Sequence, residues 1–172
     1  AGEIDLIAMY DNHVIVAEVK STYIRSSIQE IYEYRNFTLN KAAYQLSKKV
    51  EFVKNGFLNQ FFENLDDVKI HSWIIDTTLE FDHHYFDNHL KISMDEIIIS
   101  LNGKVDFMDS IVNSSFDEES DVKNIDPLNF IKNIEKDEFW EHQIGNYDNF
   151  MNLYVPCTVY QTLYSVAFWS RL

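Results

Sequence analysis

Two apolar runs near the start of the chain carry acidic side chains where half-buried strands normally carry none. The first run is residues 2–8, Gly-Glu-Ile-Asp-Leu-Ile-Ala, and the second is residues 14–20, Val-Ile-Val-Ala-Glu-Val-Lys. Burying a carboxylate is costly unless a cationic group compensates its charge. We therefore expect the two runs to pair so that their acids share a cationic partner.

The segment between the runs predicts both a hairpin and its register. Asp and Asn tolerate the left-handed backbone conformation that a two-residue hairpin loop needs. If Asp11-Asn12 is that loop, then Asp5 faces Glu18 and Glu3 faces Lys20. Because side chains alternate between the faces of a strand, the acids and the lysine are expected to gather on one face.

Asp5, Glu18 and Lys20 together predict a chemistry. Adjacent carboxylates repel unless a divalent cation lies between them, and Mg²⁺ is usually held by one or two carboxylates, with water and phosphate completing its shell. A neighbouring lysine can orient the attacking water and offset charge on a phosphate. This pattern is typical of a site that cleaves phosphodiesters.

The same residues resemble the motif of the PD-(D/E)XK nuclease superfamily, in the spelling of its Holliday-junction-resolvase-like and nuclease-related-domain groups. The resemblance implies that Asp5 and Glu18 ligate Mg²⁺ or Mn²⁺. It implies that the backbone carbonyl of Val19 adds a ligand and that Lys20 serves the water and the scissile phosphate. Glu3 matches the acid that often precedes the motif aspartate.

The resemblance extends over roughly the first hundred residues. Family members often carry a glutamine on the helix after the motif strand, and Gln45 fits that place. Gln45 and the lysines of this helix also fit an ordinary solvated face, and Lys41, Lys48 and Lys49 could contact phosphates or simply be surface residues. The family proline before the motif aspartate is replaced by Ile4.

The implied fold is α/β, a restriction-endonuclease-like core with a central mixed sheet flanked by helices. We assign that core to residues 1–112, an acidic linker or loop to 113–126, and a mainly helical acidic extension packing on the core to 127–172. Family members normally place a helix and a strand before the motif. We therefore expect a fragment that lacks those two elements and belongs to a larger protein.

Four further elements follow from local signals. A capping box at Ser27 predicts a helix that ends at Asn55-Gly56. Residues 68–77 are predicted to form a strand that lies beside residues 14–20 and completes the sheet. Asp76, near the end of this strand, is interpreted as a turn or cap residue. Helices are predicted from Ser93 to residue 101 and after Asp126-Pro127.

Residues 81–89 contain metal-competent side chains, namely His83, His84, Asp87 and His89. Adjacent histidines point apart on a strand, and no cysteine completes a zinc motif in this segment. We therefore interpret the segment as a polar loop. A loop lying over the metal site is the functional alternative.

Charge and composition limit the choice of partner. The net charge of −14 argues against a broad basic surface for DNA, yet residues 1–60 hold seven basic and seven acidic side chains, so the excess of acid lies elsewhere. The single cysteine, Cys157, is typical of a reducing cytosol, and no apolar run reaches membrane-spanning length. We expect a cytoplasmic protein that binds DNA and no membrane.

The predicted function is a metal-dependent endonuclease that hydrolyses DNA phosphodiester bonds in defence or in repair and recombination. Its expected catalytic residues are Asp5, Glu18, Lys20 and Gln45. A noncatalytic nucleic-acid or protein binding module of a larger assembly is the alternative. A third interpretation makes the acidic half a DNA mimic that occupies a basic partner.

Overall fold

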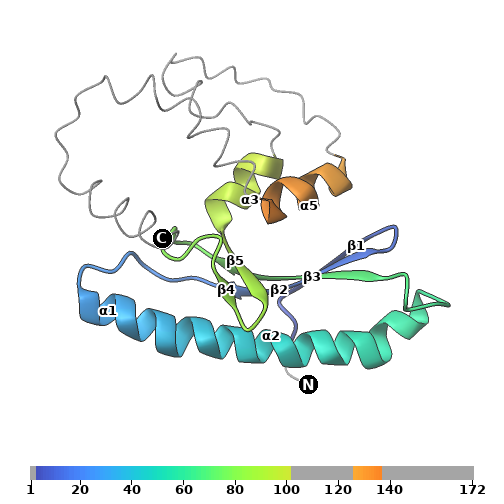
Figure 1. The fold of residues 1–172 in the computed structure, drawn as a ribbon, viewed down its shortest axis with the longest axis horizontal. Helices are drawn as coiled ribbons and strands as arrows, with labels where there is room; N and C mark the ends of the chain where they lie inside the picture. Colours follow the sequence, from blue (N-terminus) through green and yellow to red (C-terminus); the bar gives the residue numbers. More distant parts are fainter. Residues whose placement is uncertain (1–2, 102–125, 137–172) are drawn as a thin grey trace, which may run out of the picture.

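The computed structural model describes residues 3–101 and 126–136. In this part of the chain five strands form one sheet in the order β1-β2-β3-β5-β4 (Figure 1). The inner strands β2, β3 and β5 run parallel, while β1 and β4 pair antiparallel at the two edges. The α/β class expected from sequence is confirmed. The strands are β1 (Leu6–Tyr10), β2 (His13–Lys20), β3 (Lys69–Asp76), β4 (Tyr85–Phe86) and β5 (His89–Ser93).

The hairpin of β1 and β2 has the predicted register. Tyr10 pairs with His13, and the ladder continues to Leu6 and Ala17. Asp11 has a φ of 54°, in the left-handed region that this turn requires. The loop therefore sets the alignment that brings Asp5 toward β2.

Strand β3 lies beside β2 as predicted, but it does not complete the sheet. Residues 73–76 of β3 also pair with β5, and β4 pairs with β5 beyond it. The interpretation of residues 81–89 as a loop is therefore wrong for the segment that forms β4 and the start of β5. Asp87-Asn88, with φ values of 49° and 65°, makes the turn between them. It repeats the residue types of Asp11-Asn12, which is the signal that could have revealed this second hairpin.

A helical run connects β2 to β3. Its capping box at Ser27 is present as predicted. The predicted end at Asn55-Gly56 is wrong, because the run continues to Gln60. The run consists of α1 (Ile28–Glu33), the π-helix η1 (Tyr34–Leu39), α2 (Asn40–Phe52), the π-helix η2 (Val53–Phe57) and the 3₁₀ helix η3 (Leu58–Gln60).

The two π-helical segments occur where buried side chains are five residues apart. Tyr34 and Leu39 are both buried, as are Val53 and Leu58. In an α-helix a step of five residues turns the side chain about 140° away from its starting face. A π-turn takes up the extra residue, so both members of each pair stay on the face that contacts the sheet.

The sheet separates two apolar layers (Figure 1). On one face, Val14, Val16 and Ile74 pack against the helical run. On the other face, the sheet packs against α3 (Met94–Leu101) and α5 (Pro127–Glu135). Ser93 and Asp126 cap these two helices as predicted. Most of the predicted linker and of the extension, residues 113–125 and 137–172, lies outside the described residues.

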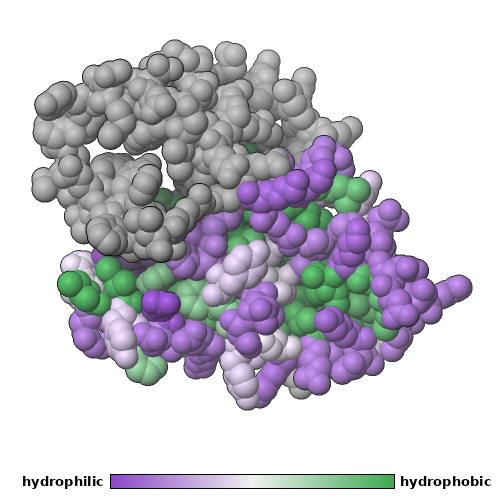
Figure 2. All heavy atoms as spheres, viewed as in Figure 1, coloured by the Kyte–Doolittle hydropathy of each residue, from purple (hydrophilic) through white to green (hydrophobic). Residues whose placement is uncertain are grey.

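The surface of the described part mixes hydrophilic and apolar areas. Figure 2 shows hydrophilic side chains over much of the face in view, with apolar patches between them. Some apolar side chains are strongly exposed, among them Ile24 at 74% and Ile28 at 87%. Within residues 3–101 and 126–136, no helix has the length and apolar character needed to cross a bilayer.

Candidate active site

The alternation of β2 places its last two polar side chains under the helical run. Val14 and Val16 belong to the apolar layer that α2 covers. Glu18 and Lys20 follow at the same two-residue spacing, so they lie on the same face of the strand. Glu18 is only 3% exposed, and a carboxylate this deeply buried needs compensating charge.

Two lysines and one backbone N–H occupy all four oxygens of the two acids. Glu18 Oε1 accepts from Lys20 Nζ at 2.5 Å, and Glu18 Oε2 contacts Lys49 Nζ. Asp5 Oδ1 lies 3.2 Å from the same Lys49 Nζ, and Asp5 Oδ2 accepts from the Val19 N–H at 2.8 Å. Two negative charges therefore meet two positive charges, which offsets the cost of burying Glu18.

Gln45 completes this group from α2. Its Oε1 accepts from Lys20 Nζ at 3.3 Å, so Lys20 is held between Glu18 and Gln45. The structure thus brings together Asp5, Glu18, Lys20 and Gln45, the four residues expected to be catalytic, whereas Glu3 is exposed.

Lys49 was expected to be a phosphate contact or a surface lysine, and its pairing with the two acids was not predicted. Gln45 and Lys49 are four residues apart, so they share one helix face. Lys48 lies elsewhere, with its ammonium 4.2 Å from the centre of the Tyr44 ring. Spacing alone gave no signal for this pairing, because Lys41, Lys48 and Lys49 all lie three or four residues from Gln45.

Electrostatics favour the charged forms of Asp5 and Lys49. Burial acts to raise the pKa of Asp5, but the Val19 N–H and the Lys49 ammonium bring it below its usual 3.8. Burial acts to lower the pKa of Lys49, but Glu18 and Asp5 raise it above 10.5. The contribution of Asp5 to stability is present above pH 3.8 and is lost as pH falls through its lowered pKa. That of Lys49 is present below pH 10.5 and is lost above its raised pKa, so both act across neutral pH.

A second group of possible metal ligands lies between β3 and β4 and at the start of α3. Among the described residues, one ligand atom each of Asp82, His83 and Glu96 lies within 4.8 Å of the others. His83 Nε2 is 2.8 Å from a Glu96 oxygen, and Lys91 Nζ is 3.5 Å from Asp82 Oδ1. Lys91 and a protonated His83 would neutralise the two acids, so this group can also be explained as a buried charge network.

The other metal-competent side chains of residues 81–89 are distributed around different partners. His89 lies between Ser47 on α2 and Ser72 on β3, with ring nitrogens 2.7 Å from each hydroxyl. Asp87 Oδ2 also accepts from Ser47, at 3.0 Å. Burial lowers the pKa of His89, which favours the neutral ring. His83 and His89 therefore serve separate contacts.

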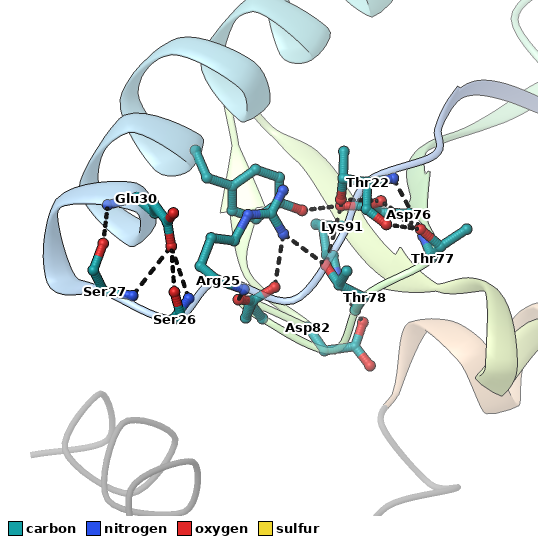
Figure 3. A network of polar contacts seen from close by, with 12 residues as sticks. Thr22, Arg25, Ser26, Ser27, Glu30, Asp76, Thr77, Thr78, Asp82 and Lys91 are labelled. Carbon is teal, nitrogen blue, oxygen red and sulfur yellow. Dashed lines mark hydrogen bonds and ion pairs between the residues drawn. The ribbon is translucent and has the colours of Figure 1, made fainter.

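Asp76 forms the centre of a buried polar network at the end of β3 (Figure 3). It is fully buried, and its carboxylate accepts from the hydroxyls of Thr22, Tyr34 and Thr78 and from the Thr77 N–H. Burial and the Asp76 carboxylate raise the pKa of Tyr34, which keeps its hydroxyl protonated as a donor. The network ties the segment after β2 to the end of β3.

The group around Glu18 combines hard oxygen ligands with a fixed ammonium. Asp5 and Glu18 direct one oxygen each at a single cation, Lys49 Nζ, and carboxylate oxygens are also the ligands that a hard divalent ion uses. Lys20 is positioned beside them by Gln45. Comparison of this chain with family models, curated proteins and solved structures found no match.

Proposed function

We propose that this chain is the core of a restriction-endonuclease-like, divalent-metal-dependent endonuclease that hydrolyses DNA phosphodiester bonds. The observation that carries the proposal is the meeting of Asp5, Glu18, Lys20 and Gln45 at one face of the β1–β2 hairpin. The motif of residues 2–20 predicts that Asp5, Glu18 and Lys20 converge, and the family resemblance adds Gln45 from a separate segment.

The donor set fits Mg²⁺ or Mn²⁺. Asp5 and Glu18 supply carboxylate oxygens, and the Val19 carbonyl is the expected third ligand. When bound, such an ion supplies Lewis-acid stabilisation of the phosphate and a water of lowered pKa. The two acids would hold it at the open end of the hairpin, where Asp5 retains a 29% exposed side chain.

Lys20 is the residue placed to act on the reacting groups. Its side chain is 26% exposed, so solvent and a phosphate can reach it. Glu18 and Gln45 fix the position of its ammonium, which can then hydrogen-bond the attacking water or offset charge on a phosphate oxygen without reorganising. Gln45 is a positioning residue for Lys20 in this proposal.

A cleavage assay on the full chain tests the proposal. Supercoiled plasmid, single-stranded DNA and a branched junction are incubated with Mg²⁺, Mn²⁺ or EDTA. We expect cleavage that needs the metal and falls about a hundredfold in Asp5→Asn, because a lost ligand removes a few kcal/mol of transition-state stabilisation. Asp11→Asn is the matched control, since Asn suits the left-handed turn and Asp11 lies outside the site. Cleavage that survives both EDTA and Asp5→Asn would disprove the proposal.

A noncatalytic binding module remains a second candidate because of one observation. The segment after β2 and the start of α1 expose apolar side chains, with Tyr23 at 71%, Ile24 at 74% and Ile28 at 87%. Clustered exposed apolar residues are typical of interaction surfaces. Binding of DNA or a protein partner with no cleavage in Mg²⁺ or Mn²⁺ would favour this candidate.

A further inference from the structure

Lys49 occupies a position that its neighbours on α2 do not share. Its Nζ lies 3.2 Å from Asp5 Oδ1 and also contacts Glu18 Oε2, and its side chain is only 10% exposed. Lys48, the residue just before it, is exposed. A single, largely covered ammonium thus contacts both acids from α2.

The oxygens that Lys49 contacts are those a divalent ion would need. The remaining oxygen of Glu18 is held by Lys20, and the remaining oxygen of Asp5 is held by the Val19 N–H. An ion held by both acids therefore shares its ligand atoms with Lys49. Charge repulsion further opposes having both cations at one pair of oxygens.

The chemistry of lysine suits a partner that can be displaced. Lysine carries a point charge on a flexible stem of four carbons, and it gains hydration when it leaves a buried pair. Lys20, in contrast, has one partner that is not an acid, because Gln45 also accepts from it. Lys49 can move away while both acids stay in place, because Glu18 lies on β2 and Asp5, just before β1, accepts from the Val19 N–H.

We propose that Lys49 is an internal counter-ion that competes with the divalent metal for Asp5 and Glu18. This inference rests on the proposed metal site and adds which residue controls whether an ion occupies that site. Metal binding requires Lys49 to leave the pair, so the apparent metal affinity of the wild-type chain is lower than the two carboxylates alone would give. Lys49 then becomes a free ammonium beside the bound ion.

Metal affinity of matched variants tests the competition. Mn²⁺ binding is measured by calorimetry and by electron paramagnetic resonance on the full chain. Lys49→Met is expected to bind Mn²⁺ about tenfold more tightly than the wild type, because charge-assisted contacts no longer oppose the ion. Lys48→Met makes the same change in net charge one residue away and is expected to stay within about twofold. Glu18→Gln identifies the site, since the measured binding must disappear in it.

Amine labelling of the wild-type chain provides a test that needs no variant. Acetylation followed by mass spectrometry is expected to show Lys49 reacting faster when Mn²⁺ is added, with Lys48 unchanged. Equal affinity in Lys49→Met and the wild type, an equal change in Lys48→Met, or unchanged labelling of Lys49 would each overturn the inference. If Lys49→Met binds Mn²⁺ more tightly as expected but no DNA cleavage is found, the proposed function alone would be overturned.

Discussion

Glu18→Gln is expected to lower Mg²⁺-dependent DNA cleavage by several hundredfold, more than any other single change at the site. The loss of about 3–4 kcal/mol of transition-state stabilisation corresponds to that factor. Glu18 is the one acid that contacts both lysines, so the amide also releases Lys20 from its fixed position. Initial rates on supercoiled plasmid with saturating Mg²⁺ measure the effect.

The control for this substitution is Glu51→Gln, which makes the same chemical change at an exposed position of α2. Its cleavage rate is expected to match that of the wild type. Glu18→Gln also leaves two ammonium groups without their shared anion, and we expect it to lower the free energy of unfolding by about 1–3 kcal/mol. Circular dichroism at the assay temperature shows whether the variant is folded. A folded Glu18→Gln protein with full activity would rule out the metal mechanism.

Asp76→Ala is expected to cause the largest loss of stability, about 3 kcal/mol or more. The substitution removes the acceptor of three hydroxyls and one backbone N–H inside a fully buried network (Figure 3). Buried donors left without an acceptor each cost about 1–3 kcal/mol, although neighbouring groups can relax and reduce the sum. Urea unfolding should show a lower midpoint with an unchanged slope.

Asp66→Ala is the matched control for Asp76→Ala, because Asp66 is exposed. Surface substitutions of this kind usually change stability by less than about 0.5 kcal/mol. Tyr34→Phe removes one donor of the Asp76 network and is expected to give an intermediate loss. If Asp76→Ala were as stable as Asp66→Ala, the network would not be what holds the segment after β2 to the end of β3.

The hairpin and the convergence of Asp5, Glu18 and Lys20 could be predicted because their signals are local, whereas Gln45 was placed by the family resemblance. The Asp11-Asn12 turn determines which residues of β1 and β2 face each other, and strand alternation determines which side chains share a face. The capping box at Ser27 and the caps of α3 and α5 can likewise each be predicted from a few adjacent residues. Each of these predictions needed no knowledge of distant contacts.

The role of Lys49 and the burial of Asp76 could not be predicted because they depend on distant partners. Lys49 meets Glu18 across 31 positions of the chain, and Asp76 meets Tyr34 across 42. Whether a lysine on α2 faces the acids depends on the rotation of that helix. A two-residue strand such as β4 carries too few side chains to show a period of two.

The π-helical segment η1 adds one residue between Tyr34 and Gln45 without turning either side chain away from the sheet. Deleting one residue from Tyr34–Leu39 would convert this wide turn into an α-helical turn, so Tyr34 would still face Asp76 and Gln45 would still face Lys20. A deletion within α2 before Gln45 has no wide turn to absorb it and would rotate Gln45 and Lys49 by about 100° away from the acids. The helical run therefore tolerates a shortening at η1 that the regular turns beside it do not.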